Sequence, residues 1–315
     1  MSAFTLQINL SPGDSAYADQ TVPALLAAHP DATERLLIVD VCKPQRTRIV
    51  DPAVRFPEPG YAERSTRIVA LAEGLLARGA VDRVVTLRPG APIFPVLSRR
   101  YLRPWVRETH DYGGCALMAY LAAFELCRTR WLLHYDADML LHQKPGYNWV
   151  RPAQSASSSH PGIIAVTPRI APPSLAASDT PSANEQLASR QVPEGWVNPW
   201  LSTRCFLVDL DRLRPLLPLL QGRVLYETLA AKALRRGYPR SPEAMLFRRM
   251  SAARRDRLVM RDSSAWLLHP TRKNELFLRL LPGLLAEVQQ GRCPPAQRGH
   301  QDLLLEAWQQ SFASP

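Results

Sequence analysis

Residues 131–141 read WLLHYDADMLL, an apolar run that leads into two closely spaced aspartates. The run at 131–135 predicts a buried strand, and Asp136 and Asp138 follow at its carboxyl end. Residues i and i+2 of an extended backbone point to the same side, so both carboxylates can face one point in space. A hard divalent cation that bridges to phosphate oxygens would relieve their repulsion. The alternative is an ordinary acidic turn at a strand end.

Apolar runs alternate with helical periodicity on the amino-terminal side of this stretch. The expected elements are strands at 4–10, 36–39 and 81–87 and helices at 22–28, 63–78 and 112–126. Strands separated by helices predict an α/β fold with a mostly parallel sheet flanked by helices. Ligands of such sheets bind at the carboxyl ends of the strands.

The pattern is less regular on the carboxyl-terminal side. A strand at 162–168 is followed by a segment rich in Pro, Ser and Ala, which predicts a flexible surface insertion over 171–198. The alternative is a lid that orders over a substrate. A strand at 205–209, two helical stretches up to Gly237 and a strand at 264–270 come next. A helical tail begins at Asn274, with an interruption expected at Pro282 and Gly283.

Composition narrows the function classes. The 315 residues are 46% hydrophobic, enough for a large core, and carry a formal net charge of +11. That charge favours an anionic partner, which could be a nucleotide, a phospholipid surface or nucleic acid. The five cysteines are scattered with no Cys-x-x-Cys pair, which argues against a disulfide framework and a zinc ribbon. The first ten residues read as a strand rather than a signal peptide, so a cytoplasmic enzyme is expected.

With these motifs the chain resembles the GT-A glycosyltransferases, most closely family 2, over roughly residues 5–270. The resemblance implies a Rossmann-like GT-A domain at 1–273 and a helical extension at 274–315. Within the domain, 1–142 would be the nucleotide-binding half and 143–273 the acceptor-side half. The implied activity is sugar transfer from a nucleotide-diphosphate donor to a saccharide, lipid-linked or small-molecule acceptor, with Mn²⁺ or Mg²⁺ as cofactor.

The resemblance also assigns roles to individual residues. Asp136 and Asp138 would hold the metal against the donor diphosphate. Asn9 and Ser11 lie in the loop that embraces the nucleotide, and Asp40 holds the position of an acidic residue that binds the base or ribose. Asp111 lies in a segment that contacts the donor in related enzymes, although a turn cap explains it equally well.

Two histidines lie near these carboxylates in the expected fold. His269 ends the strand at 264–270, where some GT-A enzymes complete the metal shell with an imidazole. A purely structural histidine is the alternative there. His134 lies inside the strand that carries the aspartates and is expected to be a hydrogen-bonded core residue.

The expected catalytic base is Glu227, which precedes a helix that ends in Gly237 and Tyr238. Its carboxylate would remove the proton from an acceptor hydroxyl, and the reaction would invert the anomeric centre. Glu243 and Asp209 are the reserve candidates. The family's Glu-Asp pair is absent, so a retaining mechanism remains open. A solvated glutamate at a helix start is the structural alternative for Glu227.

Other functions fit the sequence less well. A sugar nucleotidyltransferase would carry a glycine-rich basic loop after the first strand, and a haloacid-dehalogenase phosphatase would carry its Asp-x-Asp early in the chain. A nucleic-acid binder would need clustered basic residues with a reading helix or aromatic platform. The cluster at 248–255 reads instead as a solvated helix face, and that cluster or the Leu-rich tail could contact the inner face of a membrane. A fold that binds nucleotide sugars or nucleic acid without catalysis is the remaining alternative.

Overall fold

A computed structural model describes residues 2–174 and 190–313. Within these residues a nine-stranded sheet has the order β3-β2-β1-β4-β9-β6-β10-β8-β7. Its strands are β1 (Phe4–Leu10), β2 (Glu34–Asp40), β3 (Arg83–Leu87), β4 (Trp131–Asp136), β6 (Ile163–Thr167), β7 (Arg190–Val192), β8 (Gly195–Asn198), β9 (Cys205–Asp209) and β10 (Asp256–Met260). A smaller sheet pairs β5 (Leu140–Gln143) with β11 (Ala265–Leu268).

Most strands of the main sheet point in one direction. β1 pairs in parallel with β2 and β4, β2 with β3, and β6 with β10. β9 is antiparallel to both β4 and β6, and β8 is antiparallel to both β10 and β7. Among the described strands of this sheet, only β8 and β9 therefore run against the others. The predicted mostly parallel α/β sheet is confirmed.

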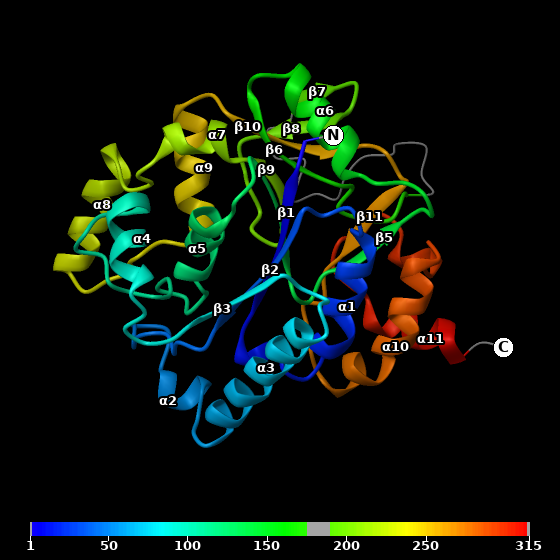
Figure 1. The fold of residues 1–315 in the computed structure, drawn as a ribbon, viewed down its shortest axis with the longest axis horizontal. Coiled ribbons are helices and arrows are strands. Elements are labelled where there is room, and N and C mark those ends of the chain that lie inside the picture. The colour runs from blue at the N-terminus through cyan, green and yellow to red at the C-terminus, as the bar shows by residue number, and fades with distance from the viewer. Residues whose placement is uncertain (1, 175–189, 314–315) are drawn as a thin grey trace.

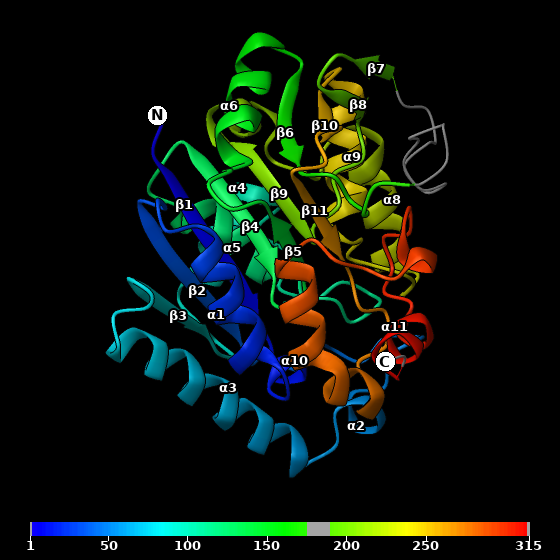
Figure 2. The same cartoon turned by 90° about the vertical axis from the view of Figure 1, so that its right-hand side faces the viewer.

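Helices cover both faces of the sheet (Figures 1 and 2). They are α1 (Ala18–Ala28), α2 (Pro52–Arg55), α3 (Gly60–Ala77), α4 (Ile93–Tyr101), α5 (Met118–Leu126), α6 (Val150–Ser159), α7 (Leu210–Leu213), α8 (Gly222–Ala233), α9 (Pro242–Ala252), α10 (Glu275–Gln289) and α11 (Leu305–Ala313), with short 3₁₀ turns η1 (Pro12–Asp14), η3 (Arg214–Leu216) and η4 (Pro295–Gln297). One core packs α1, α3 and α6 against the sheet, and a second packs α4, α5 and α9 against its other face. In the described part of the chain, no helix is long and apolar enough to cross a membrane.

The two cores explain the continuous apolar runs of the sequence. Along β2, Leu37 and Val39 belong to one core, while Leu36 and Ile38 belong to the other. A strand that is buried on both faces needs apolar residues at every position rather than at alternate ones. Full burial of each such side chain contributes about 1.5–3 kcal/mol relative to exposure.

The C-terminal segment packs on the smaller sheet. The side chain of Asn274 accepts a hydrogen bond from the amide of Phe277 at 3.1 Å and so caps α10. Phe277 and Leu281 are buried in a cluster with Trp266 of β11. The expected interruption at Pro282 is wrong, because α10 continues through it. Pro282 is exposed, so water can hydrate the carbonyl that its missing amide leaves unpaired.

Two other predicted segments differ from the structure. The helix expected from 112 begins only at Met118, because a turn organised by Asp111 precedes it. The insertion expected over 171–198 ends in β7 and β8, which pair with each other, and β8 pairs with β10, so this part belongs to the sheet. The portion of that prediction at 175–189 lies outside the described residues.

Candidate active site

The carboxyl ends of β1, β2 and β4 line a cavity of about 370 Å³. The parallel pairing of β1 with β4 sets Asn9 beside Asp136, and Asp40 is the last residue of β2. Ser11 follows β1 and also lines the cavity. The structure thus brings these predicted donor-binding residues to one edge of the sheet, where ligands of parallel α/β sheets bind.

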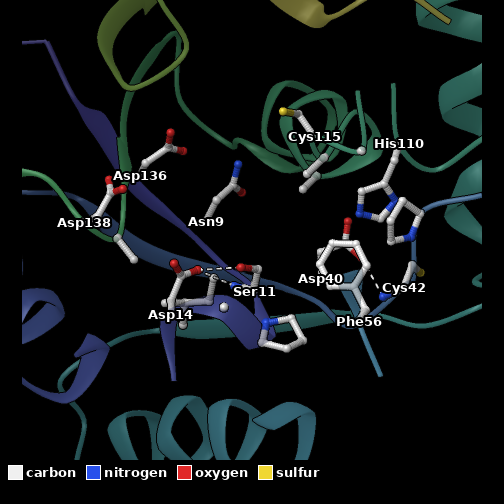
Figure 3. Close-up of a pocket in the computed structure, with 18 of the residues that line it drawn as sticks. Asn9, Ser11, Asp14, Asp40, Cys42, Phe56, His110, Cys115, Asp136 and Asp138 are labelled. Atoms are coloured by element: carbon white, nitrogen blue, oxygen red, sulfur yellow. Dashed lines mark hydrogen bonds between the residues drawn. The ribbon is translucent and has the colours of Figure 1, made fainter. Parts of the chain in front are cut away.

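The cavity has two chemically different ends. Figure 3 places Asp136, Asp138 and Asp14 toward one end and Asp40, Phe56 and His110 toward the other. Asn9 and Ser11 lie between them. One end therefore carries three carboxylates, while the other pairs one carboxylate with ring systems.

At the acidic end, the two predicted metal ligands of β4 have different partners. Asp136 Oδ1 accepts a hydrogen bond from the hydroxyl of Tyr120 at 2.8 Å and lies 3.2 Å from Nε2 of His134. Asp138 is 5% exposed, and its Oδ2 lies 3.7 Å from Nε2 of His269. The structure therefore places Asp136 and Asp138 in the cavity lining and His269 beside Asp138, although His269 itself does not line the cavity.

His134 is buried and hydrogen-bonded, as expected of a core residue, and it also fixes the orientation of Asp136. Its Nδ1 lies 2.5 Å from Oε1 of Gln7, whose amide nitrogen donates to Asn9 Oδ1 at 2.9 Å. These contacts link Asn9, Gln7, His134 and Asp136 in one chain below the cavity. Such supporting contacts hold ligating side chains in place.

Sequence reasoning missed Lys273, whose ammonium group forms an ion pair with Asp138. The ammonium also lies 5.8 Å from the ring centroid of Tyr17. Burial acts to lower the pKa of Lys273, but the charges of Asp138, Asp14 and Asp136 outweigh it and raise the pKa. Lys273 therefore supplies a permanent positive charge at the acidic end. The sequence feature that could have identified Lys273 is its position four residues after His269.

Asp14 was not among the predicted site residues, and it lies in η1, the turn that follows β1. Its carboxylate accepts hydrogen bonds from the backbone amide and hydroxyl of Ser11, at 2.7 and 2.8 Å, and from the hydroxyl of Tyr17. Burial raises its pKa against these hydrogen bonds, and the charge of Asp138 adds to the rise. The turn after β1 is thus tied to the acidic end of the cavity.

Three buried polar atoms that belong to lining residues have no hydrogen-bond partner among the described residues. They are Asn9 Nδ2, Asp40 Oδ2 and Asp138 Oδ1. A buried donor or acceptor without a partner costs about 1–3 kcal/mol, so such atoms mark places where a ligand completes the site. The pattern calls for an acceptor near Asn9, a donor near Asp40 and a cation or donor near Asp138.

The other end of the cavity suits a heterocycle with hydroxyl groups. Asp40 is 3% exposed, and burial raises its pKa to about 6, although the amide of Cys42 donates to its Oδ1 at 2.9 Å. Burial lowers the pKa of His110 to about 4, so its ring is neutral. Phe56 packs edge-on against Tyr61, with ring centroids 5.7 Å apart. Ring surfaces beside a few buried polar groups are typical of small-molecule sites.

The acidic end has the donor chemistry of a divalent-cation site. Burial lowers the pKa of His269, against the charge of Asp138, so the imidazole is neutral and can act as a ligand. In residues 2–174 and 190–313, no three His, Cys, Asp or Glu side chains are already close enough to hold a metal. Magnesium and manganese sites often use one or two carboxylates with phosphate oxygens and water, so the residues present fit. A cation on Oδ2 of Asp138 would have to replace the Lys273 ammonium there, whereas Oδ1 has no partner among the described residues.

Three predicted residues, Asp111, Glu227 and His269, do not line the cavity. Asp111 accepts hydrogen bonds from the amides of Gly113 and Cys115 at 2.8 and 2.9 Å. It therefore caps a turn, which was the alternative to its predicted role in donor binding. Glu227 lies on α8 in ion pairs with Arg223 and Arg248, at 2.8 and 3.1 Å, and does not line the cavity. The geometry therefore does not support Glu227 as the base.

The two reserve candidates for the base differ sharply. Asp209 is fully buried, caps α7 and pairs with Arg130, so it is structural. Glu243 lies in the first turn of α9 and accepts hydrogen bonds from the amide and hydroxyl of Thr203, at 2.8 and 3.2 Å. Burial raises the pKa of Tyr120, and the charges of Asp136 and Glu243 raise it further. Glu243 does not line the cavity either, but its charge acts on Tyr120, which does.

No family model and no curated protein matches this chain. Similar solved structures include S. aureus TarS 1–349, at 14% identity and a TM-score of 0.36. That match covers 84% of this chain but only 60% of the TarS chain, so the chain spans about three fifths of that neighbour. A galactosyltransferase is also among them. This structure, LgtC in complex with donor and acceptor sugar analogs, is 13% identical with a TM-score of 0.35, and the match covers 77% of this chain and 69% of LgtC. Structural similarity at this level assigns no function to the chain. The function has to be inferred from the site.

Proposed function

We propose that this protein is a glycosyltransferase that uses a nucleotide-diphosphate sugar as donor and a divalent cation bound through Asp136 and Asp138. The observation that carries the proposal is the two-ended cavity. Its acidic end has an unpaired buried oxygen on Asp138, and its other end has one on Asp40. A nucleoside diphosphate has this same polarity, with hydroxyl donors on the nucleoside and negative charge on the phosphates.

The nucleoside would lie between Asp40 and the ring of Phe56. A ribose or base donor would satisfy Asp40 Oδ2, and Asn9 Nδ2 would donate to an oxygen midway along the ligand. The diphosphate would lie beside Asp136, Asp138 and Lys273. These pairings give each unpaired buried atom a partner. The ligand thus removes the energetic cost of a buried polar atom without a hydrogen bond.

Asp136, Asp138 and His269 would hold Mn²⁺ or Mg²⁺, with manganese favoured by the imidazole. Bound there, the cation supplies charge neutralisation for a departing diphosphate. Three carboxylates and one ammonium line this end, so without further positive charge it would repel a diphosphate. Lys273 provides a second positive charge for the phosphates once it leaves Asp138.

Glu243 is the proposed base in place of Glu227. Its carboxylate accepts hydrogen bonds from Thr203 and its charge acts on Tyr120, and it belongs to the half of the chain expected to bind the acceptor. From there it can take the proton of an acceptor hydroxyl, which would be a saccharide, lipid-linked or small-molecule alcohol. A base of this kind contributes about 10²–10⁴-fold to the rate.

The test is turnover of a panel of nucleotide sugars with Mn²⁺ or Mg²⁺ by wild type, Glu243→Gln and Glu227→Gln. We expect one sugar donor to be hydrolysed or transferred, with turnover at least about 100-fold slower in Glu243→Gln and unchanged donor binding. Glu227→Gln is the matched control and should retain the wild-type rate. Equal loss in both variants would refute Glu243 as the base. Donor binding without turnover in wild type would identify a binding protein instead of an enzyme.

A further inference from the structure

Helix α8 has an unusual outward face. The exposed large apolar side chains are Tyr226 and Leu229 of the helix and Leu234 at its C-cap, which are 72%, 43% and 63% exposed. They follow one another at spacings of three and five residues, and the exposed Ala230 and Ala233 lie between them. We call these five residues the α8 face.

The opposite side of α8 packs against the rest of the protein. Val224 and Thr228 are buried, and Val224 belongs to the core that also packs α4, α5 and α9. The helix is therefore apolar on two sides, although only one of them is covered. An outward helix face is normally polar, so an apolar one indicates a surface that meets something other than water.

Positive charge surrounds the α8 face. Residues 222–240 contain five basic side chains, Arg223, Lys232, Arg235, Arg236 and Arg240, and one acidic side chain, Glu227. The difference is a net charge of +4 for this segment. Glu227 is already paired with Arg223 and with Arg248 of α9. Arg235, Arg236 and Arg240 are exposed at the carboxyl-terminal end of the helix.

We propose that the α8 face binds the surface of an anionic lipid bilayer. Leucine and tyrosine side chains would enter the boundary between headgroups and acyl chains, while the arginines contact the phosphates. A second copy of this chain fits less well, because its own arginines would face these arginines. Nucleic acid fits less well too, since exposed leucines gain nothing against a phosphate backbone.

The sequence pointed to other membrane-binding segments, and the structure has them engaged elsewhere. Arg249 and Arg255 of the basic cluster donate hydrogen bonds to the carbonyls of Leu216 and Pro161, at 2.8 and 2.7 Å. The leucines of α10 are buried or half-buried in the cluster with Trp266. In Figure 1, α8 lies at the outer edge of the molecule, on the side opposite α10 and α11.

The α8 face is connected to the border of the cavity. The amide of Tyr112 donates to the carbonyl of Pro239, just beyond α8, at 2.9 Å. Two residues after Tyr112, Gly114 lines the cavity. A docked α8 would therefore hold this border near the bilayer, which suits an acceptor presented by the membrane. This consequence rests on the proposed function, whereas vesicle binding does not.

The test is co-sedimentation of the full chain with vesicles of phosphatidylcholine alone or mixed equally with phosphatidylglycerol. The variants are Leu229→Ser/Leu234→Ser and Arg235→Gln/Arg236→Gln. The matched control is Leu76→Ser/Arg78→Gln on α3, which removes an exposed leucine and an exposed arginine elsewhere. We expect wild type and control to bind only the anionic vesicles, and each α8 variant to bind at least about tenfold more weakly. Thermal unfolding of every variant checks that it is folded.

Several results would overturn the proposal. One is that wild type does not bind anionic vesicles, and another is that it binds neutral vesicles equally well. A third is that the folded Leu229→Ser/Leu234→Ser variant binds anionic vesicles as strongly as wild type. A wild-type dimer that this variant loses, with no vesicle binding, would assign the face to a second copy. Duplex binding that only the arginine variant loses, again without vesicle binding, would assign it to nucleic acid.

Discussion

Asp40 couples stability to ligand binding through one buried carboxyl. Burial raises its folded pKa to about 6, above the ordinary 3.8, so the fold favours the protonated form. Its contribution to stability is complete below about pH 4 and is lost as the pH rises through about 6. At neutral pH the protein therefore holds an unfavourable buried charge, and its unpaired oxygen is available to a ligand.

Asp40→Asn tests this coupling, because asparagine keeps an oxygen for the Cys42 amide and removes the charge. Above about pH 7 the variant should be more stable than wild type by up to about 3 kcal/mol, and the gain should vanish below about pH 4. Urea unfolding across this pH range measures the difference. A variant that is less stable at neutral pH would contradict the predicted pKa.

Lys273 should compete with a cation for Asp138. Two unit charges about 4 Å apart interact by about 4 kcal/mol near a protein surface, so removing the ammonium should favour cation binding. Lys273→Met should therefore bind Mn²⁺ at least about tenfold more tightly than wild type in calorimetry without nucleotide. Arg272→Met is the control, since Arg272 is 75% exposed and lies 3.9 Å from Glu306. Identical Mn²⁺ affinity in Lys273→Met and wild type would show that the ammonium does not compete.

At the scale of elements, α10 supports the cavity although it contributes no lining residue. Phe277 is fully buried and packs edge-on against Tyr17, with ring centroids 5.8 Å apart. The hydroxyl of Tyr17 donates to Asp14 at the acidic end. The order of Asp14 therefore depends on how α10 docks.

Phe277→Ala should lower the free energy of unfolding by about 3–5 kcal/mol, because it leaves a cavity in a closed core. It should also weaken nucleoside diphosphate binding, since Tyr17 loses the ring that holds it. Denaturant unfolding and calorimetry measure the two effects. A destabilisation below about 1 kcal/mol would mean that α10 is not packed as described.

The elements that could be predicted are those with one dominant signal. The strand ending at Asp136 was clear because both of its faces are covered by helices. β10 was not expected, because it opens with Asp256 and Arg257, yet Arg257 is only 2% exposed. The start of α5 was placed too early, because the sequence does not distinguish a turn capped by Asp111 from the first turn of a helix.

At the scale of the whole molecule, the site joins segments that are distant in sequence. Parallel strands bring their carboxyl ends to one edge, so the grouping of Asn9, Asp40 and Asp136 could be predicted. Lys273 could not, because its place depends on how β11 and α10 pack on the smaller sheet. The contacts of Glu227 could not be predicted for a similar reason, because the way α8 docks turns it toward Arg248 and away from the cavity lining.

The central claim is that one cavity binds a nucleoside diphosphate with its nucleoside at Asp40 and its phosphates at Asp138. The most direct measurement is calorimetric titration of a nucleoside diphosphate panel with Mn²⁺ into wild type, Asp40→Asn and Asp138→Asn. We predict that wild type binds one base preferentially and that Asp138→Asn binds it at least about tenfold more weakly. Asp40→Asn should bind more weakly and lose the preference for that base. Wild type that binds no member of the panel, or an Asp138→Asn variant with unchanged affinity, would contradict the claim.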